Sequence, residues 1–488
     1  MLFNSFTFLA FFPAVSGLYF LLPHRFRWIL LLVASCGFYM FFKPIYILIL
    51  AFTIVTDYFS GIYIEKFRMR PGIKRSLLVA SLTANIGVLA MFKYYNFINA
   101  NITRMAHFAG WENSLPFLAI LLPIGLSFHT FQAMSYTIEV YRGRQNAERH
   151  FGLYALYVMF YPQLVAGPIE RPQNLLPQFS QPHRFNYRRT VSGLRLMLWG
   201  FFKKMVVADN LGVVVDNVYR RPFDQNGLTC VLAMYFFAFQ IYCDFSGYTD
   251  IARGAARVIG FQLMENFNLP YIAKSVGEFW KRWHISLSTW FRDYLYIPLG
   301  GNRIGICSQC FNLGVVFLLS GLWHGARWTY VFWGLLNGVY VIIGVLSATH
   351  VRKYLSPAIR AGIIWRIAAW FATFHLTCLT WVLFRAASLS AAIGQLRKIV
   401  TAVPELFSGM AAKRTTYEGL QLAGIRVLPW LIALIAVFFI IDVAKEHHAV
   451  RARFERSGTL RHLSYGAMLF SICIFGYAKE VRFIYFQF

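Results

Sequence analysis

The chain has 488 residues, of which 58% are hydrophobic and only 14% are charged. A soluble domain carries about 25% charged residues, and single cores stop growing near about 250–300 residues, so a larger core does not explain the missing charge. The composition therefore excludes an ordinary soluble protein and predicts an integral membrane protein.

The net charge is +27, and 18% of the residues are aromatic. In a soluble chain this combination would suggest nucleic acid stacked on aromatic platforms. Here the basic residues cluster in short loops, as cytoplasmic loops of membrane proteins require, and Trp and Tyr suit the membrane interfaces. We therefore expect no nucleic-acid partner.

The first apolar run, residues 5–22, has its nearest basic residue, Arg25, after it and not before it. A cleaved signal peptide has the opposite order, so we interpret this run as an uncleaved first span with the N-terminus outside. Alternating orientation then makes the basic loops 65–75 and 142–150 cytoplasmic, and the sparsely charged stretch 94–114 external.

Long apolar runs continue along the chain, and we count about eleven to thirteen candidate spans. Several can cross about 30 Å of hydrocarbon, and shorter ones would be tilted, broken or re-entrant. The clearest later runs are 76–92, 115–134, 311–323, 364–384, 427–444 and 463–478. No repeat or separate hydrophilic domain stands out, so we expect a single integral membrane domain over residues 1–488.

Within this domain we distinguish the N-terminal spans 1–140, a core 141–348 and the C-terminal spans 349–488. The part from 141 to 310 is rich in Pro, Gly, Arg and Trp, and its apolar runs are interrupted. Irregular backbone at membrane depth is tolerated only where it is buried in protein or lines a wet cavity. We therefore expect the site in this middle region. The one CxxC, Cys307 and Cys310, lacks a second pair or a histidine cluster, so we expect no metal site.

The first of four notable blocks is YPQLVAGPIERPQNLLPQF, residues 161–179. Its four prolines and Gly167 forbid one continuous helix. A re-entrant turn leading into an amphipathic surface piece and a simple loop are both consistent with this stretch.

The second block is QIYCDFSGYTDIARGAARVIG, residues 240–260. Charges beside an apolar span need partners or water. Asp250 and Arg253 share a helix face, and we favour an internal ion pair that stabilises the fold. For three other polar residues, a cavity-lining and substrate-binding role is equally open: Asp244, Ser246 and Tyr248.

The third block is WKRWHISLSTWFRDYLYIPLGGNR, residues 280–303. On a helix, Trp280, His284 and Ser288 would form one stripe. An interfacial helix explains the tryptophans and cations but not His284. A cationic face beside a cavity would suit a phosphorylated, nucleotide-tailed substrate. The candidate donor-binding residues here are Lys281, Arg282, Trp283, Ser288, Arg292 and Asp293.

The fourth block contains SGLWHGARW, in which His324 stands between two apolar runs. A lone histidine in a soluble core is usually structural, but ionisable groups inside membrane spans are rare and are functional candidates. Gly321 and Gly325 leave room for a ligand or a neighbouring backbone, and Trp323 is a further candidate contact. Imidazole can take a proton from a hydroxyl and return it.

These four blocks, in this order and with the ending FIYFQF (483–488), resemble the membrane-bound O-acyltransferase (MBOAT) superfamily. Within it, the chain is most similar to the bacterial branch represented by the membrane subunit of alginate O-acetylation. The resemblance covers nearly the whole chain. It implies an all-α, polytopic ring of tilted helices around a central pore, with re-entrant segments at the cytoplasmic side.

The resemblance also implies an O-acetyltransferase of the bacterial inner membrane. The expected donor is acetyl-CoA as a co-substrate, with no bound cofactor, although an acyl-carrier protein serves some relatives. A periplasmic SGNH-hydrolase-like partner in a polysaccharide synthesis and export complex would move the acetyl group to sugar hydroxyls. Alginate, cellulose and peptidoglycan all stay open as acceptors. The near-invariant histidine of the family falls on His324, and its second polar residue falls on His284.

We hypothesise that His324 is a general base on the acceptor hydroxyl and that His284 orients the thioester or relays the proton. An acyl-enzyme route through His324 stays open. One rival reading is a proton-coupled transporter, although the sequence shows no repeat of the kind that transporters commonly carry. Another is a non-catalytic scaffold, for which both histidines would be dispensable.

Overall fold

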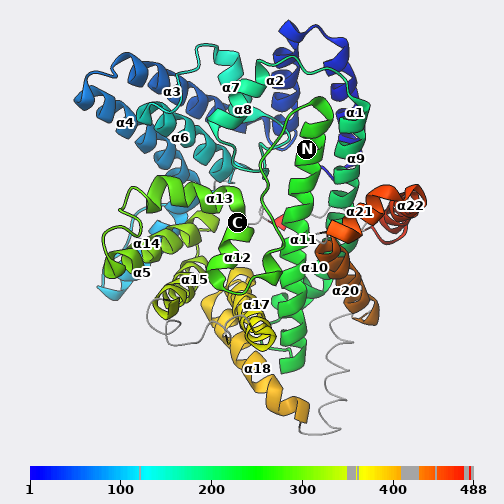
Figure 1. The fold of residues 1–488 in the computed structure, drawn as a ribbon. Coiled ribbons are helices and arrows are strands. Elements are labelled where there is room, and N and C mark those ends of the chain that lie inside the picture. Colours follow the sequence, from blue (N-terminus) through cyan, green and yellow to red (C-terminus); the bar gives the residue numbers. More distant parts are fainter. Residues whose placement is uncertain are drawn as a thin grey trace. The chain divides into compact units, whose positions relative to one another are not determined.

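The computed structural model describes residues 1–119, 122–348, 359, 362–407, 428–445, 448–476 and 483–484. These residues form helices joined by turns and irregular segments (Figure 1). Within them there is no strand, and Phe267 and Trp283 form one isolated antiparallel bridge. The predicted all-α class is therefore confirmed.

The chain forms two compact units. The first contains Met1–Met197, Tyr248–Met264 and Tyr485–Phe488, and the second contains Leu198–Gly247 and Glu265–Ile484. The chain changes from one unit to the other within α9 and within the long helix α11.

The first unit is built from short and medium helices with defined breaks. α6 begins after Gly125 and ends before Gly143, and both glycines adopt positive φ angles, 75° and 72°, that favour glycine. The helices that begin in this unit are α1 (Phe6–Leu21), α2 (His24–Met40), η1 (Pro44–Tyr46), α3 (Ile47–Lys66), α4 (Pro71–Leu89), η2 (Ala90–Tyr94), α5 (Tyr95–Phe108), α6 (Leu126–Arg142), α7 (Phe151–Met159), α8 (Pro172–Phe179) and α9 (Tyr187–Phe201).

The second unit contains the remaining helices and the third and fourth sequence blocks. Its helices are η3 (Phe202–Ala208), α10 (Asp209–Arg220), the first part of α11 (Gly227–Ile259), η4 (Pro270–Ile272), α12 (Val276–Arg282), α13 (Ile285–Phe291), η5 (Arg292–Tyr296), α14 (Ile306–His324), α15 (Trp328–Leu346), α17 (Ile363–Arg385), α18 (Leu389–Phe407), α20 (Leu428–Ala444), α21 (His448–Arg456) and α22 (Gly458–Phe475).

Six helices in the described part of the chain are long and apolar enough to cross a membrane. They are Pro44–Lys66, Pro71–Phe108, Gly227–Ile259, Ile306–His324, Trp328–Leu346 and Ile363–Arg385, and Phe6–Leu21 and Pro429–Ala444 are shorter apolar helices. The multi-pass class is thus confirmed, whereas the central pore and the larger number of spans stay predictions.

The stretch 94–114 is helical as far as Phe108, and its external position stays a prediction. One sequence-based boundary is wrong. The expected span 115–134 is not one helix, because its described residues before Leu126 are non-helical. Prolines and Gly125 interrupt the apolar run there, and side-chain amides of α5 bond the irregular backbone, as in the pair between Asn96 and Leu118.

The irregular segment between α7 and α8 confirms that the first block is not a continuous helix. Residues 160–170 are buried although they form only turns and extended backbone. The short helix α8 then buries one face, including Leu175 and Phe179. This arrangement agrees with the first interpretation of the block, a turn that leads into a short amphipathic helix. Whether the turn re-enters the membrane stays a prediction.

α14 and α15 pack side by side as a hairpin whose close approach depends on glycine (Figure 1). A Cβ on Gly321 would lie 2.3 Å from the carbonyl oxygen of Tyr330, and a Cβ on Gly334 would lie 2.3 Å from that of Phe317. Small residues let helix backbones approach in this way. The room that Gly321 leaves is therefore taken by a neighbouring backbone.

Candidate active site

His324 is the last residue of α14, and the chain turns at Gly325 before α15 begins. It therefore stands at the end of its apolar helix and not in the middle of one. Its side chain is buried, with 3% of the residue exposed. Three aromatic rings surround it and form what we call the aromatic cage. Their centroids lie 4.9 Å (Trp323), 5.0 Å (Trp333) and 5.3 Å (Phe384) from that of the imidazole.

His284 lies between α12 and α13 in a left-handed backbone conformation, with a φ of 45°. For a residue other than glycine this conformation costs about 1–2 kcal/mol. Neighbouring backbone bonds hold it there: Asn266 accepts from the amides of Ile285, at 3.0 Å, and Ser286, at 3.2 Å. Strain maintained by its surroundings is typical of functional positions.

The ring of His284 contacts Phe245 at 4.7 Å and Trp323 at 5.9 Å. Because Trp323 also contacts His324, one indole joins the two histidines that the sequence singled out. His284 lies outside the six candidate spans, and burial lowers its pKa to about 3. Its imidazole is therefore neutral at physiological pH.

The predicted stripe of Trp280, His284 and Ser288 on one helix is wrong. The helix ends at Arg282, Trp283 is extended, and a second helix begins at Ile285. The left-handed turn separates His284 from the other two residues. Trp280 and Ser288 line a pocket, to which His284 does not contribute.

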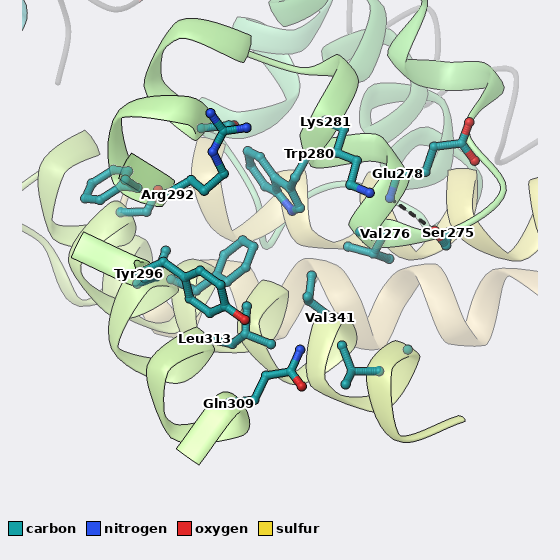
Figure 2. Close-up of a pocket in the computed structure, with 18 of the residues that line it drawn as sticks. Ser275, Val276, Glu278, Trp280, Lys281, Arg292, Tyr296, Gln309, Leu313 and Val341 are labelled. Carbon is teal, nitrogen blue, oxygen red and sulfur yellow. Dashed lines mark hydrogen bonds between the residues drawn. The ribbon is translucent and has the colours of Figure 1, made fainter. Parts of the chain in front are cut away.

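This pocket has a volume of about 660 Å³ and is lined by residues of α12, α13, η5, α14 and α15. Figure 2 shows the indole of Trp280 between Lys281 and Arg292, with Tyr296 and Gln309 on the facing wall. The rest of the lining is largely apolar and includes Leu313, Phe317 and Val341. An apolar cavity of this size with a few polar groups is typical of ligand sites.

Two lining residues connect this pocket to the aromatic cage. The ring of Trp280 contacts Trp333 at 5.5 Å, and Trp333 contacts His324. Ser320 also lines the pocket and precedes His324 by one helical turn, so both lie on the same face of α14. The pocket and the buried histidine are therefore neighbours.

The candidate residues of the third block divide into two groups. Lys281, Ser288 and Arg292 line the pocket. The other three do not. Arg282 pairs with Glu278 at 2.9 Å, Asp293 pairs with Arg292 at 2.7 Å, and Trp283 is buried among aromatic rings.

The candidates of the second block lie in other surroundings. Asp244 accepts from Lys204 at 2.5 Å and from the backbone amide of Ile484 at 2.8 Å. Ser246 accepts from Lys203 at 2.9 Å. Tyr248 belongs to the first unit, where its ring stacks on Phe3 at 4.5 Å. None of the three lines the pocket beside Trp280.

Sequence reasoning missed the lysines that partner Asp244 and Ser246. Lys204 also pairs with Asp209 at 2.7 Å, and we call Lys204, Asp209 and Asp244 the lysine–aspartate cluster. The signal was present, because the pair Lys203 and Lys204 follows the apolar end of α9. Two adjacent cations beside a buried helix require anionic or polar partners.

The ion pair expected in the second block is confirmed. Arg253 lies 3.6 Å from Asp250, one turn away on α11. In the first block, the carboxylate of Glu170 is fully buried and accepts hydrogen bonds of 2.5 Å each from the amide of Met264 and the side chain of Asn174. Both arrangements stabilise irregular or charged parts of the fold.

The CxxC cysteines are free thiols at the start of α14, with Cys307 exposed and Cys310 half-buried. Among the described residues, no group of three His, Cys, Asp or Glu side chains is placed to hold a metal ion.

Comparison with known proteins connects this geometry to a family. Residues 148–385 match the membrane-bound O-acyltransferase family. The chain is 39% identical to the "Probable alginate O-acetylase AlgI" of Pseudomonas aeruginosa, over 80% of this chain and 73% of that protein.

Two further relatives carry other names. The peptidoglycan O-acetyltransferase of Helicobacter pylori is 35% identical, over 76% of this chain and 73% of that protein. The teichoic acid D-alanyltransferase of Bacillus subtilis is 28% identical, over 54% of this chain and 68% of that protein. Both histidines and the pocket lie within the matched family region. The chain belongs to the membrane-bound O-acyltransferase family, and it is a multi-pass membrane acyltransferase.

Proposed function

We propose that this protein is an O-acetyltransferase that takes an acetyl group from acetyl-CoA for the O-acetylation of an exported polysaccharide such as alginate. The observation that carries the proposal is the placement of His324 beside the pocket that Trp280 and Ser320 share. The names of the relatives, which concern alginate and peptidoglycan acetylation, support the acetyl group and the glycan.

The pocket suits a CoA thioester in its polarity. Lys281 and Arg292 would pair with phosphate groups, which Arg and Lys bind through charge-assisted hydrogen bonds. The apolar wall near Leu313, Phe317 and Val341 would contact the uncharged arm that ends in the thioester. Ser320 then lies in the direction in which that arm must extend to reach His324.

In the proposed chemistry, His324 takes the proton of the acceptor hydroxyl as its oxygen attacks the acetyl carbonyl, and then returns a proton to the leaving thiolate. The neutral ring of His284, held by its strained backbone, contacts Trp323 and orients the thioester from there. Exclusion of water from this buried pair protects the thioester from hydrolysis.

The proposed location is the bacterial inner membrane, with the N-terminus in the periplasm. Acetyl-CoA enters from the cytoplasm, and a periplasmic SGNH-hydrolase-like partner of the polysaccharide export complex receives the acetyl group. The positive net charge, gathered in short loops, supports an orientation with those loops inside. Cellulose and peptidoglycan are alternative acceptors for the same chemistry.

The test is release of free CoA from acetyl-CoA by the purified protein, with transfer of labelled acetyl to a glycan or partner. His324→Ala should lower the rate by about 10²–10⁴-fold, the usual contribution of a general base. His375→Ala is the matched control, because His375 is a histidine of α17 that bonds its own helix at Phe371. Its rate should equal that of the wild type.

Full acetyl transfer by His324→Ala would exclude the general-base role. A wild-type protein that transfers no acetyl group but carries a proton-coupled flux in vesicles would support a transporter. A scaffold predicts that neither His324→Ala nor His284→Ala changes glycan acetylation in cells.

A further inference from the structure

Three buried indole N–H groups lie in and beside the aromatic cage of His324. They belong to Trp280, Trp333 and Trp381, and none of them has a hydrogen-bond acceptor among the described residues. The ring of Trp333 contacts both of the others, with centroids 5.5 Å from Trp280 and 5.8 Å from Trp381. Two of these residues, Trp333 and Trp381, are at most 1% exposed.

A buried donor without an acceptor is unusual in a folded protein. Buried indole N–H groups normally find a partner, and leaving a buried donor unsatisfied costs about 1–3 kcal/mol. Phenylalanine would keep an aromatic ring at each position without this cost. Three such donors in one cluster therefore indicate that an acceptor atom is supplied by something that binds there.

Of the three tryptophans, Trp333 is the one in contact with His324. Its ring centroid lies 5.0 Å from the imidazole, and the two ring planes are nearly perpendicular, at 88°. It also contacts Trp280, which lines the pocket. Trp333 thus stands between the proposed route of the thioester and the proposed base.

We propose that the indole N–H of Trp333 donates a hydrogen bond to the carbonyl oxygen of the acetyl thioester and stabilises the negative charge that develops on it. This role rests on the proposed function and adds a catalytic residue to it. Donors fixed in a water-excluded site and aimed at a developing oxyanion are among the strongest contributors to acyl transfer.

In this step, the acceptor oxygen forms a bond to the acetyl carbon, its proton goes to His324, and the carbonyl π pair moves to the oxygen that accepts from Trp333. The tetrahedral intermediate then re-forms the carbonyl and breaks the carbon–sulfur bond, and the thiolate takes the proton from His324. The hydrogen bond to Trp333 is strongest in the intermediate, so it lowers the barrier more than it favours substrate binding.

The experiment compares Trp333→Phe with Trp370→Phe in the assay of CoA release. Both variants replace an indole by a phenyl ring, but the N–H of Trp370, on α17, already donates to the carbonyl oxygen of Tyr271 at 2.8 Å, and Trp370 does not line the pocket. Trp333→Phe should lower kcat about 100- to 1,000-fold with little change in KM, as loss of an oxyanion donor does. Trp370→Phe should leave both constants within about twofold of the wild type.

A second measurement tests the hydrogen bond itself. A ketone analogue of acetyl-CoA, with a methylene group in place of sulfur, keeps the carbonyl and cannot be cleaved. In protein labelled with ¹⁵N-tryptophan, the indole signal that disappears in Trp333→Phe should move downfield when the analogue is added to the wild type.

Any of three results would overturn this inference: a wild-type kcat in Trp333→Phe, an equal loss of kcat in both variants, or a Trp333 signal that does not move on saturation with the analogue. The proposed function would then still stand if wild-type protein transfers acetyl and His324→Ala does not. Failure of wild-type protein to use acetyl-CoA would overturn the proposed function and this role together.

Discussion

Two regions of the second unit bury ionisable side chains and differ in the groups that surround those side chains. The lysine–aspartate cluster holds one ammonium group between two carboxylates, at 2.7 Å and 2.5 Å. The histidine site instead surrounds His324 with the rings of the aromatic cage. The exposure of Lys204, Asp244 and His324 is equally low, at 3–4%.

The difference lies in what remains for a ligand. In the lysine–aspartate cluster, the ion pairs are internal, and Asp244 also bonds the backbone of Ile484, whereas the second carboxylate oxygen of Asp209 has no hydrogen-bond partner among the described residues. Beside His324, the indole N–H of Trp333 has no acceptor within the described part of the chain, and a pocket begins at the next ring. Neither the burial of an ionisable group nor one polar atom without a partner therefore distinguishes the two regions; the pocket that adjoins the aromatic cage does.

The same distinction holds in the first unit. Asp57 is fully buried within a candidate span, and it would be a functional candidate by position alone. Its carboxylate accepts from Ser81, Asn85 and Thr137, which come from α4 and α6. These bonds satisfy the charge internally, and we assign Asp57 to the stability of the fold.

The strongest test of the comparison is Lys204→Met, which leaves Asp209 and Asp244 buried without their cation. Burial lowers the pKa of Lys204, and the two carboxylates raise it more, so it lies above its usual value and the group stays protonated. Breaking a buried pair typically costs about 3–5 kcal/mol. We expect a loss of that size in the free energy of unfolding, measured in detergent by denaturant titration.

The control removes the carboxylates as well. Lys204→Met combined with Asp209→Asn and Asp244→Asn should recover much of the stability, because no unpaired charge remains. If Lys204→Met unfolds like the wild type, the lysine–aspartate cluster does not stabilise the fold and its separation from the histidine site is lost.

A second prediction concerns the buried carboxyl of Glu170, outside the candidate spans. Burial raises its pKa from 4.5 to about 7, although Met264 and Asn174 donate hydrogen bonds to it. The folded protein therefore binds a proton that the unfolded chain lacks between these values. The stabilisation is fully present below about pH 4.5 and is lost as the pH rises through about 7.

Glu170→Gln removes this titration and keeps an amide of similar shape. From pH 5 to pH 8, the wild type should lose about 2 kcal/mol of unfolding free energy relative to the variant. Thermal or denaturant unfolding at the two pH values measures the difference. Parallel curves for both proteins would show that Glu170 titrates normally and is not part of a buried polar network.

Sequence reasoning predicted the all-α membrane class, which is confirmed, and it singled out both histidines, whose roles stay predictions, because both inferences depend on local signals. A charged fraction of 14% over 488 residues is hard to reconcile with a soluble fold, and an imidazole between apolar runs is conspicuous without any coordinates. The ion pair of Asp250 and Arg253 was accessible for the same reason, since both residues lie on one helix turn.

The rest depends on long-range contacts. The break at His284 is held by Asn266, 18 positions earlier, so a helix stripe through Trp280 and Ser288 looked continuous in the sequence. Lys204 meets Asp244 across 40 positions. The acceptor-free indole of Trp333 is likewise visible only once all its neighbours are placed.

The smallest expected effect tests which of two adjacent cations contributes to the pocket. Lys281 and Arg282 are adjacent cations in the sequence, yet Lys281 lines the pocket, whereas Arg282 pairs with Glu278 and with the carbonyl oxygen of Asn268. If the pocket binds the phosphates of CoA, Lys281 contributes to binding and Arg282 does not.

Lys281→Gln should therefore raise KM for acetyl-CoA about three- to fivefold, as expected for one partly exposed charge pair, with kcat unchanged. Arg282→Gln is the matched control and should leave KM within experimental error, because its guanidinium is already occupied outside the pocket. The effect of Lys281→Gln should shrink as salt is raised from 50 to 500 mM, since screening weakens an exposed pair most. An equal rise in KM for both variants would mean that the net charge of α12 affects KM and that this pocket does not bind the donor. The donor site would then lie away from Trp280, and the proposed route to His324 would lose its support.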